Sequence, residues 1–159
     1  MIQKYWLTAI LVGTTLSIPV IASSQHSLSL TLAQRPTVSR TVQNGDWQIT
    51  LTNAKSLGRK VNYGGISYEA VGIWTTTTVT VRNTTSQRQS EESGRAFLYG
   101  AQFVDTQGNS HGVEHVVGDS RVSGKPYSSG ESRTYTIMFD TPNRVQMSYL
   151  GLSGSYLGF

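Results

Sequence analysis

The stretch "GIWTTTTVTVRNTT", residues 72–85, limits more than any other what this chain can fold into. Threonine occupies five of the seven positions from 75 to 81, and valine occupies the other two. β-Branched residues lose side-chain freedom in a helix and fit well on a pleated strand. Ile73, Val79 and Val81 fall on one phase of the alternation, whereas a row of threonines falls on the other. The stretch therefore predicts a half-buried strand with threonine hydroxyls on its outer face.

A functional alternative for these threonines is a regular hydroxyl array of the ice-binding kind. Such an array needs threonine rows stacked across several strands, and the sequence shows no second threonine row of this length. One strand of about seven residues is too small a platform for it. We therefore interpret the row as an ordinary outer face. Asn83-Thr84-Thr85 also matches a glycosylation sequon, which matters only in a host that glycosylates exported proteins.

The alternation of apolar and polar residues recurs along the chain, as expected for short strands with one buried face. It is visible in "DWQITLTN", "KVNYGGISY", "AFLYGAQFVD", "RTYTIMFDTP" and "VQMSYLGL", and "HGVEHVV" supplies a seventh candidate strand. Together with 16 glycines and few charged residues, this pattern predicts an all-β, antiparallel β-sandwich of about seven strands. The residues expected to face the core are Trp47, Ile49, Leu51, Val79, Val81, Ile137 and Phe139.

The N-terminus resembles an export signal. Lys4 precedes an apolar run that ends near Pro19 with the small-residue exit "VIA". We expect residues 1–22 to be a signal peptide cut after Ala22, with a cut after Ala33 as the alternative. An uncleaved membrane anchor is disfavoured, because the run is shorter than the roughly 20 apolar residues that a spanning helix needs. The expected location is therefore secreted or periplasmic, and membrane contact would come only through an uncleaved leader.

The rest of the chain is divided by composition. Residues 23–44 are polar and rich in serine and glutamine, so we expect a flexible arm there, followed by a β-sandwich domain over residues 45–152 and a tail over 153–159. The chain has no cysteine, which excludes disulfides and a lipid anchor on cysteine. It has 13 Lys plus Arg and 9 Asp plus Glu, and the basic residues are scattered. No basic stripe is therefore available for nucleic acid, and we expect no nucleic-acid partner.

The segment "HGVEH", residues 111–115, matches the H-x-x-E-H string of inverted zinc peptidases. That chemistry needs a helix, in which His111 and His115 would lie about 6 Å apart. Gly112 and the neighbouring valines disfavour a helix, and a strand separates the two histidines by about 13 Å. We therefore expect two surface histidines on a loop or edge strand, with no metal, no cofactor and no catalytic residue.

Exposed tyrosine and tryptophan rings can recognise sugars or proteins. Several aromatic residues of this chain stand near glycine-rich turns, although most aromatic side chains serve packing. The candidate ligand contacts are Tyr63, Tyr68, Trp74 and Tyr127.

The order of "GDWQITLTNAK", "VTVRNTT", "FVDTQGN" and "SSGESRTYTIMFDTP" resembles the secreted bacterial immunoglobulin-like domains known as domain of unknown function 4352. These domains are related in fold to the telokin-like mycobacterial immunoprotective proteins. The resemblance covers about residues 45–152 and implies an immunoglobulin-like β-sandwich at the cell envelope or outside the cell. The family has no established catalytic residues, and many relatives carry a lipobox cysteine that this chain lacks.

These observations lead to one functional expectation and two alternatives. We expect an exported, non-catalytic binding or structural module that acts on a protein or an envelope polymer. The first alternative is a small outer-membrane β-barrel, suggested by the end "GLSGSYLGF" but disfavoured because its strands would consume nearly the whole exported chain. The second alternative is a secreted hydrolase whose site is assembled in space from distant residues.

Overall fold

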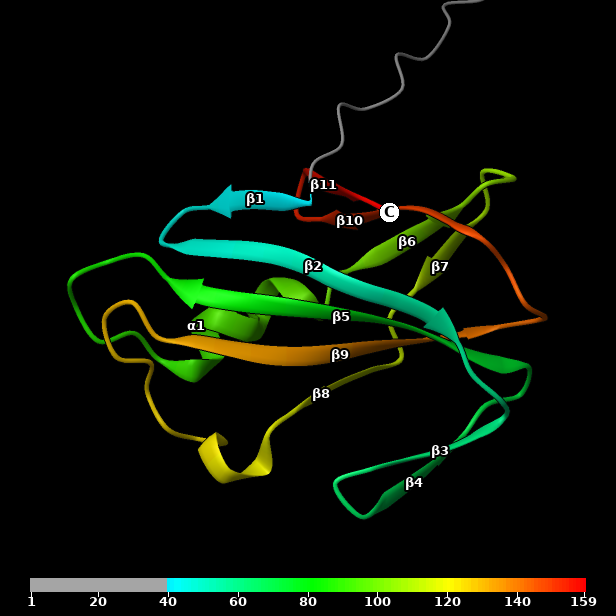
Figure 1. Ribbon diagram of the computed structural model, residues 1–159, viewed down its shortest axis with the longest axis horizontal. Helices are drawn as coiled ribbons and strands as arrows, with labels where there is room; N and C mark the ends of the chain where they lie inside the picture. The colour runs from blue at the N-terminus through cyan, green and yellow to red at the C-terminus, as the bar shows by residue number, and fades with distance from the viewer. Residues whose placement is uncertain (1–39) are drawn as a thin grey trace, which may run out of the picture. The chain divides into compact units, whose positions relative to one another are not determined.

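The computed structural model describes residues 40–159. Their strands form two larger antiparallel sheets and one separate hairpin (Figure 1). The five-stranded sheet has the order β1-β2-β5-β9-β8, made of Thr41–Asn44, Trp47–Ser56, Ile73–Asn83, Ser132–Thr141 and His115–Gly118. The four-stranded sheet has the order β11-β10-β6-β7, made of Ser155–Gly158, Met147–Leu152, Gln102–Asp105 and Ser110–Gly112. The hairpin consists of β3 (Lys60–Tyr63) and β4 (Ile66–Glu69).

The core lies between the two larger sheets. Ile49, Val79 and Phe139 from the five-stranded sheet pack in one cluster with Phe103 and Leu150 from the four-stranded sheet. All seven residues that the sequence predicts as core are buried: Trp47, Ile49, Leu51, Val79, Val81, Ile137 and Phe139. The prediction of an all-β sandwich is therefore confirmed. The strands form two open sheets, so the alternative in which they close into one continuous sheet is not the arrangement found.

Strand β5 departs from the predicted outer threonine row at one position, Thr76. Thr75 and Thr77 lie on the inward phase and are fully buried, and Thr76 is buried on the opposite face. The Oγ1 of Thr75 bonds to Thr141 at 3.0 Å, which satisfies its hydroxyl in the interior. The first half of β5 is therefore covered on both faces. The alternation of residue types along the strand could not indicate this.

A threonine row does exist on the outer face, but it runs across the strands. Thr80 of β5 pairs with Thr50 of β2 on one side and with Thr134 of β9 on the other, and Thr50 pairs in turn with Thr41 of β1. Each neighbouring strand contributes a single threonine to this row, so the row is not a second threonine stretch of the kind absent from the sequence. The strand register brings these residues together, although they are far apart in the sequence.

The domain is longer at both ends than the expected boundaries. Strand β1 lies within the range assigned to the arm, and strand β11 lies within the range assigned to the tail. Leu157 of β11 is fully buried in the core, so this segment belongs to the sandwich. Residues 1–39, including the expected leader and both cleavage sites, lie outside the described residues. Among the described residues, no helix is long and apolar enough to cross a membrane.

Short helical turns connect some of the strands. They are α1 (Glu91–Arg95), η1 (Ala96–Leu98) and η2 (Ser120–Val122). The hydroxyl of Ser90 accepts from the Ser93 amide and caps α1, which explains a helical turn in a segment of mostly polar residues. The sequon residue Asn83 is buried, and its side-chain amide donates to the carbonyls of Gln87 and Ser128. This amide is therefore not available for glycosylation in the folded domain.

Candidate functional site

The β3–β4 hairpin is built by its turn. Gly64 and Gly65 form the two-residue turn with φ values of 60° and 82°. A turn with two positive φ values matches the twist of the flanking strands and favours glycine. The register pairs Tyr63 with Ile66 next to the turn and Val61 with Tyr68 two residues farther from it. Because side chains alternate along a strand, these four residues share one face of the hairpin.

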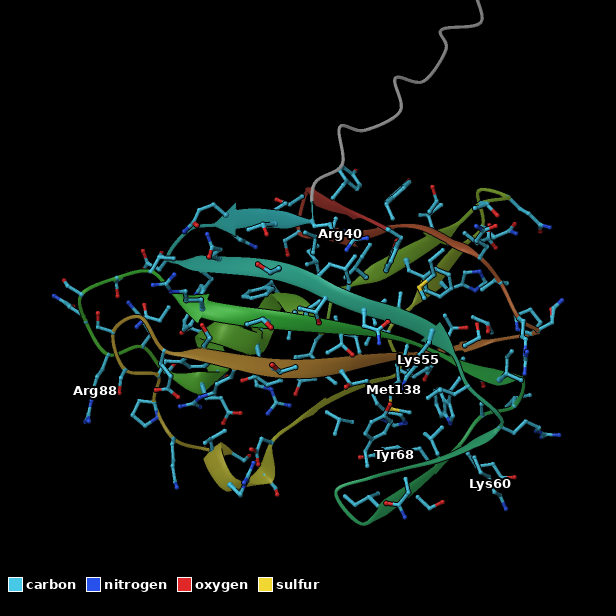
Figure 2. The ribbon with its side chains drawn as sticks, viewed as in Figure 1. Arg40, Lys55, Lys60, Tyr68, Arg88 and Met138 are labelled. Carbon is cyan, nitrogen blue, oxygen red and sulfur yellow. The ribbon has the colours of Figure 1, made fainter. Side chains whose placement is uncertain are left out.

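That face packs on the outer side of the five-stranded sheet through a small second core. Its buried members are Ala70, Trp74 of β5 and Met138 of β9. Val61, Tyr63, Tyr68, Leu57 and Val117 are the partly buried residues that pack around them. Tyr68 and Met138 lie close to each other where the hairpin approaches the sheet (Figure 2). The opposite face of the hairpin is polar and carries an ion pair between Lys60 and Glu69 at 3.2 Å.

An aromatic cluster fixes the hairpin to the sheet. The indole Nε1 of Trp74 donates to the carbonyl of Tyr68 at 3.2 Å. The ring of His115, on edge strand β8, lies 4.9 Å from the Tyr68 ring and 5.6 Å from the Trp74 ring, measured between centroids. The three rings come from three different segments, so the sequence alone could not show that they meet.

Beyond this cluster the hairpin presents an exposed apolar surface. We call Tyr63, Ile66 and Tyr68, which share the sheet-facing side of the hairpin, the hairpin ledge. Ile66 is 58% exposed, whereas Tyr63 and Tyr68 are half-buried. The tip of the hairpin therefore carries apolar side chains that the sheet does not cover. Val71, just after the hairpin, is 89% exposed and is a second isolated apolar residue.

The structure separates the four predicted ligand contacts. Tyr63 and Tyr68 lie on the hairpin ledge, and Trp74 lies beneath it with 3% of its surface exposed, so Trp74 supports the ledge from below. Tyr127 lies elsewhere and is fully buried in the main core. Its ring packs edge-on against Trp47 at 4.9 Å and carries the Arg133 guanidinium at 4.0 Å. The Tyr127 ring therefore has no exposed surface to offer a ligand.

The two histidines of "HGVEH" lie on strands of different sheets, His111 on β7 and His115 on β8. Neither histidine lies on a helix, so the i, i+4 helical pairing that this string needs in a zinc peptidase is not formed. Among the described residues, no group of three histidine, aspartate or glutamate side chains could hold a metal ion. The expectation of two surface histidines was wrong for His111, because its side chain is only 12% exposed and stacks on Phe103 at 4.4 Å.

His111 belongs to a hydrogen-bonded turn built around Asp105. Its Nε2 lies 3.1 Å from Asp105 Oδ2, and both carboxylate oxygens of Asp105 also accept from Asn109. Burial raises the pKa of Asp105, but hydrogen bonds from Asn109, His111 and the Gln107 amide outweigh it and lower the pKa to about 2. This carboxylate is therefore held as an anion that stabilises the turn.

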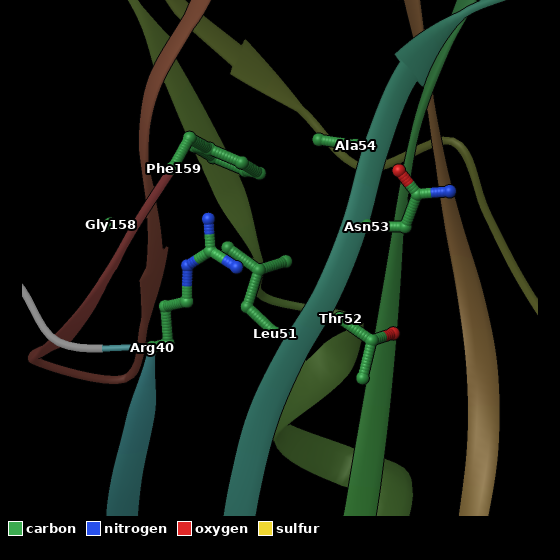
Figure 3. A pocket seen from close by; sticks show the side chains of 7 residues that line it. All are labelled: Arg40, Leu51, Thr52, Asn53, Ala54, Gly158 and Phe159. Carbon is green, nitrogen blue, oxygen red and sulfur yellow. The ribbon is translucent and has the colours of Figure 1, made fainter.

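A groove lies along the edge of the five-stranded sheet, beside the start of β1. It has a volume of about 250 Å³ and lies between Arg40, Leu51 and Ala54 on one side and Phe159 on the other (Figure 3). A second hollow of about 360 Å³ continues from Ala54 and Phe159 past Ser56 and Met147. Sequence reasoning missed this groove, because its walls come from β2 and from the segments around β10 and β11.

The comparisons with known proteins support the fold. No protein-family model matches the chain, and no curated protein matches it. Among solved structures, the chain is similar to a β-sandwich protein from Clostridium difficile 630, with a TM-score of 0.52 and 13% identity over 76% of this chain and 89% of that chain. It is also similar to MPT63, a secreted protein from Mycobacterium tuberculosis, with a TM-score of 0.51 and 19% identity over 79% of this chain and 96% of that chain. At these identities the likeness concerns the β-sandwich fold alone.

Proposed function

We propose that this chain is an exported, non-catalytic binding module that contacts a protein or an envelope polymer through the hairpin ledge. The observation that carries the proposal is the exposure of Ile66 at the tip of a hairpin that Trp74 and Met138 hold in place. A rigid, exposed apolar side chain flanked by half-buried tyrosines is the arrangement found at the centre of many protein interfaces. Such a surface binds without chemistry of its own.

The export part of the proposal rests on the leader pattern of residues 1–22. The fold likeness to a secreted protein from M. tuberculosis agrees with it. The order of strand motifs supports a finer proposal, that the chain is related to domain of unknown function 4352. Intact-mass measurement of the exported protein tests the export part, with an expected new N-terminus after Ala22 or Ala33. An exported protein that still begins at Met1 would contradict it.

Crosslinking pull-down from the native envelope fraction tests the binding part. The exported protein should capture a reproducible partner, and Ile66→Ser should reduce the captured amount severalfold. Ile66 is exposed, so this substitution should leave the melting temperature nearly unchanged. Val71→Ser is the control, because it removes an even more exposed apolar side chain outside the ledge. Equal capture by the wild type and the Ile66→Ser variant would refute the ledge as the contact surface.

A further inference from the structure

The edge of strand β2 is only half covered. Strand β1 pairs with residues 47–50 of β2, and the carbonyl of Arg40 extends this pairing to the Leu51 amide at 2.8 Å. Residues 53–56 of β2 pair with β5 on their other side. Among residues 40–159, no strand pairs with them on the side that β1 occupies farther along. Half of β2 is therefore a sheet edge that can accept another strand.

The backbone groups on this edge can be assigned from the hydrogen bonds. Leu57 donates its amide to the Trp74 carbonyl of β5 at 2.6 Å. Because successive residues of a strand point their N–H and C=O groups to opposite sides, Lys55 and Asn53 also face β5, whereas Ser56 and Ala54 face the free edge. An added strand would find two N–H donors and two C=O acceptors there.

The groove lies directly beside this edge. The side chain of Ala54 lines both of its parts, and Phe159 closes it from the opposite side (Figure 3). An added strand would point alternate side chains into this space, between Leu51, Ala54 and Met147. Small branched apolar side chains fit such a shallow groove, and the backbone hydrogen bonds at its rim would supply most of the affinity.

The charged side chains that line the groove have one sign. Arg40 lines one end and Lys55 lines the other, and no acidic side chain lines either part. Within the described part of the chain, neither cation forms a salt bridge. In Figure 3 the Arg40 guanidinium lies between the Phe159 ring and Leu51. An acidic partner is therefore favoured, and a basic one is repelled.

We propose that this half edge of β2 binds an extended, acidic polypeptide segment of a partner protein, which adds a strand collinear with β1. The segment alternates apolar residues, which enter the groove, with residues on the outer face. It carries one carboxylate near Arg40 and one near Lys55. The proposal goes beyond the hairpin ledge, because the groove and the hairpin are made of different residues. The β-bulge of β2 between Leu51 and Asn53 limits indiscriminate edge pairing, which leaves a short segment as the fitting partner.

The test uses the exported protein and a fluorescent, end-capped peptide, Val-Glu-Val-Thr-Glu. In the orientation of β1 its last glutamate meets Arg40, its first glutamate meets Lys55 and its valines face the groove. Two control peptides replace the central valine by proline or both glutamates by lysine. We expect fluorescence anisotropy to show saturable, salt-sensitive binding of the first peptide and at least about tenfold weaker binding of both controls, because proline removes the strand N–H and lysine reverses the charge.

Two protein variants complete the experiment. Ala54→Pro removes a donor only from the free edge, where proline is tolerated, and Arg40→Glu keeps the proposal testable if Ala54→Pro fails to fold. Each variant should bind the acidic peptide at least about tenfold more weakly than the wild type. Ala54→Pro loses a hydrogen bond and packing space, and Arg40→Glu loses a charge partner. Ile66→Ser should bind the peptide as the wild type does, so failure of the hairpin proposal and failure of this one remain distinguishable.

Amide hydrogen exchange gives the decisive readout. Ala54 and Ser56 should exchange fast in the free protein and slowly with the peptide bound. Slow exchange of both amides in the free monomer would mean that the chain's own N-terminal residues already cover the edge, and would overturn the proposal. Slow exchange that depends on protein concentration would assign the edge to a second copy and would overturn it too. Equal binding of all three peptides, or no binding of any, would also overturn it.

Discussion

The indole Nε1 of Trp74 donates a hydrogen bond to the backbone carbonyl of Tyr68 at 3.2 Å, and this bond joins the five-stranded sheet to the β3–β4 hairpin. Trp74 is almost fully buried, so its N–H has little access to water as an alternative acceptor. The hairpin has few other connections, because β3 and β4 pair only with each other. Hydrogen bonds of the backbone hold the two ends of the hairpin segment, at Gly58 and Val71, to β5 and β9. The position of the hairpin itself depends on the Trp74 side chain and on the apolar contacts around it.

Trp74→Phe should loosen the hairpin more than the sandwich. Phenylalanine keeps an apolar ring on Met138 but removes the indole N–H that donates to the Tyr68 carbonyl, and it leaves unfilled volume. We expect a loss of about 1–3 kcal/mol in the local opening free energy of residues 60–69, measured by amide hydrogen exchange. Amides of β9 should keep their wild-type protection. Uniform loss of protection across both regions would show that the hairpin and the sandwich open as one unit.

Phe139→Ala should destabilise the whole domain. Phe139 is fully buried and packs edge-on against Phe103 at 4.8 Å, so its removal leaves a cavity between the two sheets. The free energy of unfolding in urea should fall by about 3–5 kcal/mol. The chain has no disulfide to compensate. Val71→Ala, at a position 89% exposed, should change the free energy of unfolding by less than about 0.5 kcal/mol. Similar losses of stability in both variants would contradict the assignment of Phe139 to the core.

The sandwich could be predicted because the alternation of apolar and polar residues in each core strand indicates which face of the strand is buried. Trp47, Ile49 and Leu51 alternate with polar residues, and the buried side of β2 follows from that pattern alone. The pattern of a strand does not indicate burial that another segment of the chain causes. Thr76 alternates like an outer-face residue, but it lies at the end of β5 that the hairpin approaches, and it is buried. The covering segment is a tertiary feature that no strand pattern contains.

The candidate sites show the same limit. Tyr63 and Tyr68 flank a glycine turn, and a local signal of this kind can be found in the sequence. The meeting of His115 with Tyr68 depends on packing between elements distant in the sequence. The groove beside β2 depends on where β1 stops pairing, and β1 itself was assigned to the arm because its four residues carry a single apolar side chain, Val42.

The turn around Asp105 should make the domain sensitive to acid. The pKa of Asp105 is lowered from 3.8 to about 2 in the folded domain, so this carboxylate binds a proton more tightly in the unfolded chain than in the folded one. This contribution to stability is therefore complete above pH 3.8 and is lost as the pH falls towards 2. Urea unfolding between neutral pH and pH 2 should show the loss in the wild type.

The Asp105→Asn variant should already be less stable at neutral pH, and its stability should fall less steeply in acid. Asp119→Asn is the control. Hydrogen bonds from Arg121 also lower the pKa of Asp119 to about 2, but the Asp119 side chain is 41% exposed, and solvent screening leaves such exposed pairs with little effect on stability. If Asp105→Asn followed the wild-type acid limb, other carboxylates would have to account for the pH dependence.

The buried tyrosine pair should make the domain sensitive to alkali. The hydroxyls of Tyr127 and Tyr135 lie 2.7 Å apart inside the core, and burial raises the pKa of both. In the unfolded chain tyrosine ionises at about pH 10. Above that pH the unfolded state loses protons that the folded state retains, so the free energy of unfolding should fall as the pH rises. Below it the two states carry the same protons at these positions, and the pair adds no pH dependence.

Tyr127→Phe should cost about 1–3 kcal/mol at neutral pH, because it leaves the buried Tyr135 hydroxyl without a partner. The double variant Tyr127→Phe/Tyr135→Phe removes both hydroxyls, so it should cost less than the sum of the two single variants. It should also unfold with a shallower dependence on pH above about 10, since neither position can then ionise. Urea midpoints for the four proteins at neutral pH and in alkali complete the cycle. Identical alkaline slopes in the wild type and the double variant would assign the effect to groups outside this pair.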